Sequence, residues 1–144
     1  GHTRVACRYG LYLTSPLPSM EPTRIDHVVL YATDVDATAE FYERCGMDRE
    51  TFDDGRVAVT FGDAKINLHQ AGNEYVPHAR SPEPGSADFC LIVDEEVEAV
   101  AAHLNSEGID LVAGPVEKVG AQGPMDSVYV TDPNGNLVEF ASYR

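Results

Sequence analysis

Short apolar runs with a period of two alternate along this chain with two longer runs of helical period. The first strand is expected over 25–32 ("IDHVVLYA"), where β-branched and apolar residues predominate. A helix should follow, with Asp34 or Asp36 as its N-cap and Gly46 at its end. Three further strands are expected at the stretches "RETFDD", "RVAVTFG" and "KINLHQ", the first two joined by an Asp-Gly turn. The predicted order is therefore one strand, one helix and three strands.

The same order of elements returns in the second half of the chain. A strand and a helix that ends at Gly108 are followed by three more strands, expected at "IDLVAGP", "DSVYVTD" and "NLVEFASY". Gly120–Pro124 is expected to be a simple connection or a mobile loop on the substrate side, and 132–135 ("DPNG") a turn. A repeat of a whole supersecondary unit implies two similar modules packed together, and hence an α+β fold.

The repeat divides the chain into four parts. The first βαβββ module covers 23–70 and the second covers 87–144, and a linker rich in proline and glycine joins them over 71–86. Patterned sequence begins just after Met20, so residues 1–22 are treated as an N-terminal extension, either a tag remnant or a flexible segment.

Side-chain alternation places a set of polar residues on the sheet face away from each helix. In the last strand, Val138 and Phe140 face the helix, so Glu139 between them points to the other side. The polar residues of this opposite face come from four strands: His27, Asn67, His69, Asp88, Cys90 and Glu139. Imidazoles and carboxylates together suit a divalent ion such as Zn, Ni, Fe, Mn or Mg, and coordination would remove the cost of a buried carboxylate. A polar barrel interior without metal is the alternative.

Composition narrows the classes of partner. The 144-residue chain carries a formal net charge of −14, which argues against nucleic acid and anionic membrane as partners. Its three cysteines are widely spaced and form no Cys-x-x-Cys pair, so a reduced, cytoplasmic setting is expected. Cys90 is expected to be a core thiol and not a nucleophile. No apolar run approaches the roughly 20 residues that a membrane span requires.

Several motifs together resemble one known superfamily. The stretches that carry the resemblance are "IDHVVLYATDVDATAEFY", "KINLHQAG", "PGSADFCLI" and the ending "DPNGNLVEF". Over roughly 24–144 the chain resembles the vicinal oxygen chelate superfamily, which includes glyoxalase I, fosfomycin resistance proteins, methylmalonyl-CoA epimerase, extradiol dioxygenases and bleomycin resistance proteins. Within it, the chain looks most like the glyoxalase domain-containing protein 5 group.

The resemblance implies a cupped, barrel-like mixed sheet with the helices outside and a metal inside. It implies ligands at His27, which matches the first-strand histidine, and at Glu139, which matches the last-strand glutamate. The repeat partner of Glu139 is Asn67, where the family usually has glutamate or histidine. His69 faces the same way two residues later and is expected to be the ligand in its place. Asp88 stands where the second module usually has histidine and is expected to be the fourth ligand.

The function implied is that of a metal-dependent, glyoxalase-like enzyme of lyase, isomerase or dioxygenase type. Its small substrate would chelate the ion through vicinal oxygens, Glu139 would move a proton, and Asn67 and Tyr129 would contact the substrate. The resemblance also favours a homodimer, in some members with modules exchanged between chains. The alternative is a non-enzymatic small-molecule binding protein of the bleomycin-resistance type.

Overall fold

The computed structural model describes residues 19–144, so most of the predicted N-terminal extension lies outside the described residues. The first module forms a four-stranded sheet in the order β1-β4-β3-β2, in which β1 and β4 are parallel and the other pairs antiparallel. Its elements are β1 (His27–Ala32), α1 (Val35–Arg44), β2 (Asp48–Phe52), β3 (Arg56–Phe61) and β4 (Ala64–Gln70). Asp34, one of the two expected caps, accepts a hydrogen bond from the backbone N–H of Ala37 at the start of α1.

The second module repeats the first strand by strand. Its sheet has the order β5-β8-β7-β6, and β5 and β8 are again the parallel pair. Its elements are β5 (Asp88–Ile92), α2 (Val97–Ser106), β6 (Ala113–Gly120), β7 (Gly123–Thr131) and β8 (Leu137–Tyr143). The α+β class and the repeat of a βαβββ unit are therefore confirmed.

The pairing register is the same in the two sheets. Val29 lies opposite Asn67 in the first, and Cys90 lies opposite Glu139 in the second. Asn67 and Glu139 are thus equivalent positions, as their places in the sequence repeat predict.

One predicted strand is wrong in position. The stretch 109–112 forms no strand, and β6 begins at Ala113 and runs on to Gly120. Ile109 is apolar because it is buried in the core beside α2, with 7% of its surface exposed, and not because it belongs to the sheet. The expected loop at Gly120–Pro124 is the tip of a hairpin, since Gly120 pairs directly with Gly123.

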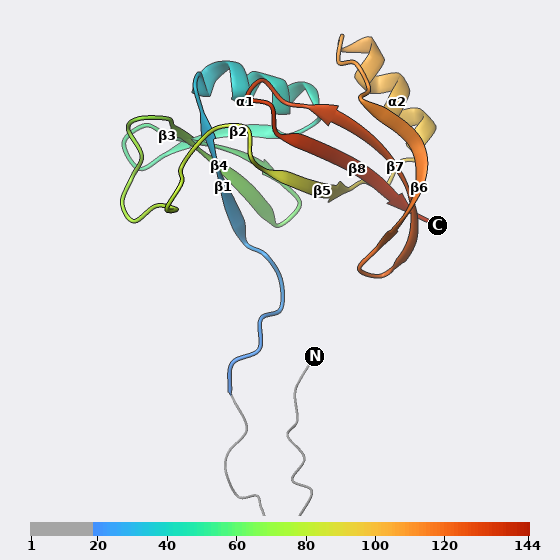
Figure 1. Cartoon of the computed structure of the whole chain (residues 1–144), viewed down its shortest axis with the longest axis horizontal. Coiled ribbons are helices and arrows are strands. Elements are labelled where there is room, and N and C mark those ends of the chain that lie inside the picture. Colours follow the sequence, from blue (N-terminus) through green and yellow to red (C-terminus); the bar gives the residue numbers. More distant parts are fainter. Residues whose placement is uncertain (1–18) are drawn as a thin grey trace, which may run out of the picture.

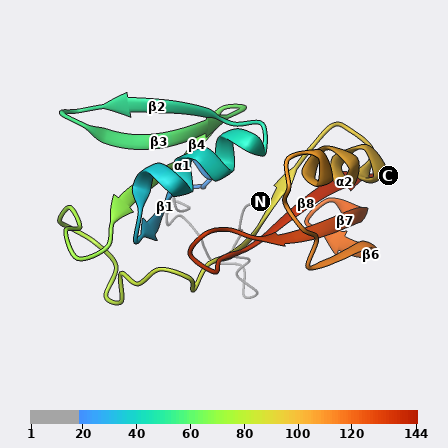
Figure 2. The ribbon, with the colours of Figure 1, turned by 90° about the horizontal axis from the view of Figure 1, so that it is seen from above.

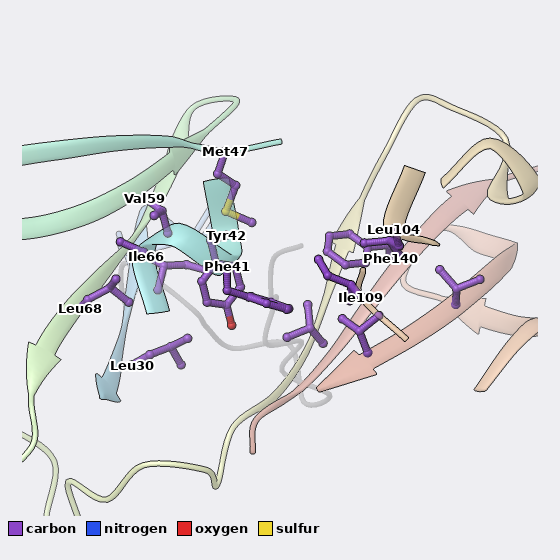
Figure 3. Close-up of a cluster of buried hydrophobic side chains, with 14 of the residues drawn as sticks. Leu30, Phe41, Tyr42, Met47, Val59, Ile66, Leu68, Leu104, Ile109 and Phe140 are labelled. Atoms are coloured by element: carbon purple, nitrogen blue, oxygen red, sulfur yellow. The ribbon is translucent and has the colours of Figure 1, made fainter. Parts of the chain in front are cut away.

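Both helices cover the same side of the molecule and leave the other side of the sheets open (Figure 1). Seen from above, the two sheets are separate layers that do not close into one barrel within the chain (Figure 2). One continuous apolar core lies between the helices and the sheets, and Figure 3 shows its two halves around Tyr42 and Phe140. Among the described residues, no helix is long and apolar enough to cross a membrane.

The turn between β7 and β8 ties the modules together. Asp132 is 4% exposed, and its carboxylate accepts a hydrogen bond from the Tyr42 hydroxyl of α1 at 2.7 Å. The same carboxylate accepts from the backbone N–H groups of Asn134 and Asn136 and from the Asn136 side-chain amide. The Asn134 side chain in turn accepts from the Thr33 backbone N–H of the first module. The "DPNGN" stretch therefore builds the contact between the modules as well as a turn.

Candidate functional site

The predicted site residues lie on the open faces of the two sheets. In the first sheet, Leu30 is buried in the core under α1, and alternation places His27 on the opposite, open face beside β4. In the second sheet, Val138 and Phe140 are buried beneath α2, so Glu139 points to the open face. The structure thus confirms the faces that alternation predicts.

The His27 ring is hydrogen-bonded to the carboxylate of the preceding residue. Its Nδ1 lies 2.8 Å from Oδ1 of Asp26, and this hydrogen bond is the main reason that the pKa of Asp26 is lowered. An Nδ1–H that donates to a carboxylate fixes the ring and leaves Nε2 as the free nitrogen. Nearly half of the His27 side chain, 48%, is exposed. His27 is therefore oriented and accessible.

Along the strands, Asn67 lies closer to His27 than His69 does. His27 pairs with Lys65, and Asn67 follows two residues later on the same face. His69 pairs with Tyr31, four residues from the His27 level, which corresponds to roughly 13 Å along the strands. The Asn67 Oδ1 atom is buried without a hydrogen-bond partner among residues 19–144. The register therefore favours Asn67 over His69 as the neighbour of His27, and a ligand role for either stays a prediction.

His69 lies in an aromatic and basic cluster at the other end of the open face. Its ring makes edge contacts with the rings of Tyr31 and Tyr75, at centroid distances of 5.9 Å and 5.1 Å. Burial, and after it the charge of Arg56, lowers the pKa of His69. The Arg56 guanidinium lies over the Tyr75 ring at 3.8 Å.

Glu139 is the centre of the polar group in the second sheet. The Ser127 hydroxyl of β7 donates to its Oε2 at 2.6 Å, and Ser127 itself is fully buried. Tyr129 faces Glu139 across the β7–β8 pair, and burial, then the Glu139 charge and a hydrogen bond to it, raise the pKa of Tyr129. Asp88 begins β5 on the same face and is exposed. Glu139 is thus held in place by β7 and half-open to solvent.

Cys90 lies beside Glu139 and is exposed, so the expectation of a core thiol is wrong. The thiol is still expected to react slowly with alkylating agents. Partial desolvation in the sheet and the neighbouring carboxylate raise the pKa of its thiol to about 11. At pH 8 this pKa should reduce the rate of iodoacetamide labelling on the order of 100-fold relative to N-acetylcysteine, because only the thiolate reacts. Site-resolved mass spectrometry checks this rate. Labelling as fast as that of N-acetylcysteine would mean that Cys90 is activated, contrary to the expectation of an inert thiol.

The candidate ligands form two half-sites and not one centre. Within residues 19–144 no three His, Cys, Asp or Glu side chains gather as a metal-binding group. The half-site of the first module contains His27 and Asn67, and that of the second contains Asp88 and Glu139.

Four residues that support these positions were missed by the sequence reasoning. Alternation could have found Ser127, two residues before Tyr129, and the hairpin register could have found Arg56. Asp26 is adjacent to His27 in the sequence, but only the structure shows their contact. Tyr75 comes from the linker, which has no periodicity to indicate its direction.

An open cavity of about 710 Å³ lies between the modules on the helix side. It contains none of the predicted site residues. Its apolar lining includes Met47 and Phe61 from the first module and Leu91, Leu104 and Phe140 from the second.

Comparisons with known proteins agree with this architecture. The profile of the Glyoxalase/Bleomycin resistance protein/Dioxygenase superfamily matches residues 24–140. The chain is 46% identical over 120 residues to the glyoxalase domain-containing protein RDO1 of Mycosarcoma maydis, covering 83% of this chain and 68% of that protein. It is also 46% identical over 121 residues to the virulence protein STM3117 of Salmonella typhimurium, covering 83% and 84% of the two chains.

Solved structures show the same likeness. The crystal structure of STM3117 has a TM-score of 0.85 at 44% identity and covers 87% of this chain and all of that one. The crystal structure of lactoylglutathione lyase from Agrobacterium tumefaciens has a TM-score of 0.65 at 25% identity, covering 85% and 96% of the two chains. The chain therefore belongs to the glyoxalase/bleomycin resistance protein/dioxygenase superfamily.

Proposed function

We propose that the protein is a metal-dependent enzyme of the glyoxalase type, acting on a small substrate that chelates the ion through two adjacent oxygens. The observation that carries the proposal is the repeat-related pair of half-sites. His27 has its ring fixed by Asp26, and Glu139 is fixed by Ser127 at the open face of the other sheet. The likeness to a lactoylglutathione lyase supports the same class of chemistry.

The donor atoms suit a divalent cation. His27 offers an imidazole nitrogen, Asp88 and Glu139 offer carboxylate oxygens, and Asn67 offers an amide oxygen. The Asn67 Oδ1 atom is buried without a partner in the described part of the chain, and a cation would satisfy it. Three oxygens and one nitrogen favour the harder ions of the set Zn, Ni, Fe, Mn and Mg.

The protein residues divide the chemistry between them. A bound divalent ion would act as a Lewis acid on the two substrate oxygens. Glu139 would take a proton from the carbon beside them and return it to the neighbouring carbon. Ser127 donates to Oε2 of Glu139 and so fixes the orientation of this carboxylate. Tyr129, held protonated by its raised pKa, contributes a hydrogen-bond donor beside Glu139.

The complete site needs a second copy of the chain. Since His27 and Glu139 lie on separate sheets that do not close within one chain, we propose a homodimer in which the open face of the first module meets that of the partner's second module. Apolar side chains exposed on strands of the second sheet support association: Ile92 is 52% exposed and Val116 is 38% exposed.

Metal content tests this function directly. The chain purified without chelators is expected to retain about one divalent ion per chain, measured by elemental analysis. His27→Ala and Glu139→Ala should each weaken binding of that ion by at least 10-fold, because each removes a ligand. His78→Ala is the matched control, since His78 is an exposed imidazole in the linker. Failure of the wild type to retain any of the five ions, or equal loss in His78→Ala, would contradict the proposal.

If metal binds, turnover separates the reaction types. Turnover of the hemithioacetal of methylglyoxal and a thiol indicates a lyase, and oxygen uptake with a catechol indicates a dioxygenase.

A second candidate function is the binding of a small apolar molecule without chemistry, which the cavity of about 710 Å³ between the modules favours. Saturable binding of an apolar dye together with no retained metal would support that function instead.

A further inference from the structure

Three arginines of this acidic chain form ion pairs in its described part, but Arg56 does not. Arg24, Arg49 and Arg144 each form ion pairs with one or two carboxylates. In the part of the chain that the structure describes, Arg56 forms no ion pair, although 24 acidic residues stand against 10 basic ones in the sequence. Arg56 is half-buried and lies over the Tyr75 ring. A half-buried cation without a counter-ion is costly, so this arrangement is poised to accept an anion.

His69 supplies a second unsatisfied group at the same place. Only 9% of its surface is exposed, and its Nδ1 has no hydrogen-bond partner among residues 19–144. Buried polar atoms are normally hydrogen-bonded, so an orphaned ring nitrogen indicates a missing partner. Tyr31 and Tyr75 contact the ring by their edges and leave this nitrogen unsatisfied.

Arg56 and His69 face each other across neighbouring strands. Val57 pairs with Leu68, so the next positions, Arg56 and His69, are opposite each other on the open face. The linker bounds this place from outside, because the Ala79 backbone N–H donates to the Tyr31 hydroxyl at 3.1 Å.

Glu74 is the carboxylate whose charge acts on His69, but it does not serve as the counter-ion of Arg56. Its carboxylate accepts a hydrogen bond from the Gly72 backbone N–H, and its pKa is lowered mainly by that bond and by one from its own backbone N–H. An ionised Glu74 that is already bonded to the backbone leaves the Arg56 guanidinium free for an external anion.

We propose that Arg56 and His69 form a carboxylate-binding subsite at the end of the open face remote from His27. This deepens the proposed function and rests on it in one respect: the bound carboxylate is a part of the substrate. The four-residue offset between His27 and His69 places that carboxylate roughly 13 Å from the metal end of the substrate. The substrate is therefore an elongated anion, with vicinal oxygens at one end and a carboxylate at the other.

A carboxylate suits the subsite better than a phosphate does. The planar fork of one arginine matches a carboxylate, and one added imidazole completes the contact. Phosphate groups are usually met by several backbone N–H groups at a glycine-rich loop or a helix N-terminus. In this structure the subsite is built from side chains on β3 and β4, on the sheet face opposite α1.

Probe binding to the full chain, kept free of metal by a chelator, tests the subsite separately from the metal. Benzoate is expected to bind saturably and to shift the ring ¹⁵N signals of His69 in NMR spectra. Benzamide, its neutral analogue, should bind at least 10-fold more weakly, and so should inorganic phosphate. Equal binding of benzamide, or tighter binding of phosphate, would overturn the proposal of a carboxylate subsite.

Variants locate the binding. Arg56→Gln should weaken benzoate binding by roughly 10-fold to 100-fold, as expected for loss of a hydrogen bond to a charged group. Arg56→Lys should retain part of the affinity, and Arg49→Gln, on the helix side, should retain all of it. Wild-type affinity in Arg56→Gln would overturn the proposal. If Arg56→Gln fails to fold, the benzoate affinity of Arg56→Lys and the ring ¹⁵N shifts of His69 in the wild type test the proposal instead. Since no metal is present, failure here leaves the metal test of the proposed function intact.

Discussion

Replacing Asp132 with alanine is expected to lower the free energy of unfolding by about 3–5 kcal/mol. The Asp132 carboxylate is 4% exposed and accepts from four donors: the Tyr42 hydroxyl, two backbone N–H groups and the Asn136 amide. Truncation leaves these donors buried without an acceptor, and it removes the hydrogen bond between Tyr42 of α1 and the turn of the second module. The loss should therefore exceed that of a single hydrogen bond.

Urea unfolding of three variants separates the parts of this effect. Tyr42→Phe removes one hydrogen bond between the modules and keeps the turn, so it should cost about 1–2 kcal/mol. Asp110→Ala is the control, because Asp110 is exposed. If Asp132→Ala is no less stable than Asp110→Ala, the turn does not join the modules in the way the structure indicates.

The order of elements and the sheet faces were predictable because they depend on local periodicity. Alternation placed Glu139 opposite Val138 and Phe140, and the repeat made Asn67 its equivalent, as the register confirms. The strand predicted at 109–115 begins four residues too early, because an apolar residue such as Ile109 carries the same local signal whether it joins a sheet or a core. The burial of Asp132 against Tyr42 is a contact across 90 residues, which no local pattern reports.

The candidate site shows a second limit of local patterns. Alternation predicts which face of a strand a side chain is on, but it does not predict which residue of the neighbouring strand lies opposite. The prediction therefore treated His27 and His69 as ligands of one ion. The register separates them by four residues and assigns His69 to the cluster with Arg56. Likewise, side-chain alternation predicts that His27 and Glu139 both face the open side of the molecule. It does not show that the two residues lie on separate sheets.

Mixing two defective variants is expected to restore metal binding. His27→Ala removes a ligand of the first module and Glu139→Ala one of the second, so each homodimer should retain little metal. If each site combines the first module of one subunit with the second module of its partner, a mixed dimer has one intact site. Equal amounts, after subunit exchange, should then regain about a quarter of the wild-type metal content, because half of the dimers are mixed and each holds one of two sites.

The double variant His27→Ala/Glu139→Ala provides the matched control for this mixture. Exchanged with an equal amount of wild type, it should leave about a quarter of the metal of an all-wild-type sample, because both sites of every mixed dimer lack a ligand. A site complete within one chain would leave about half, since wild-type chains would keep their metal whatever their partner. No recovery in the first mixture and half occupancy in the second would therefore contradict the shared site. The two half-sites on the open faces favour the first outcome, because nothing within residues 19–144 brings a third His, Cys, Asp or Glu ligand to either one.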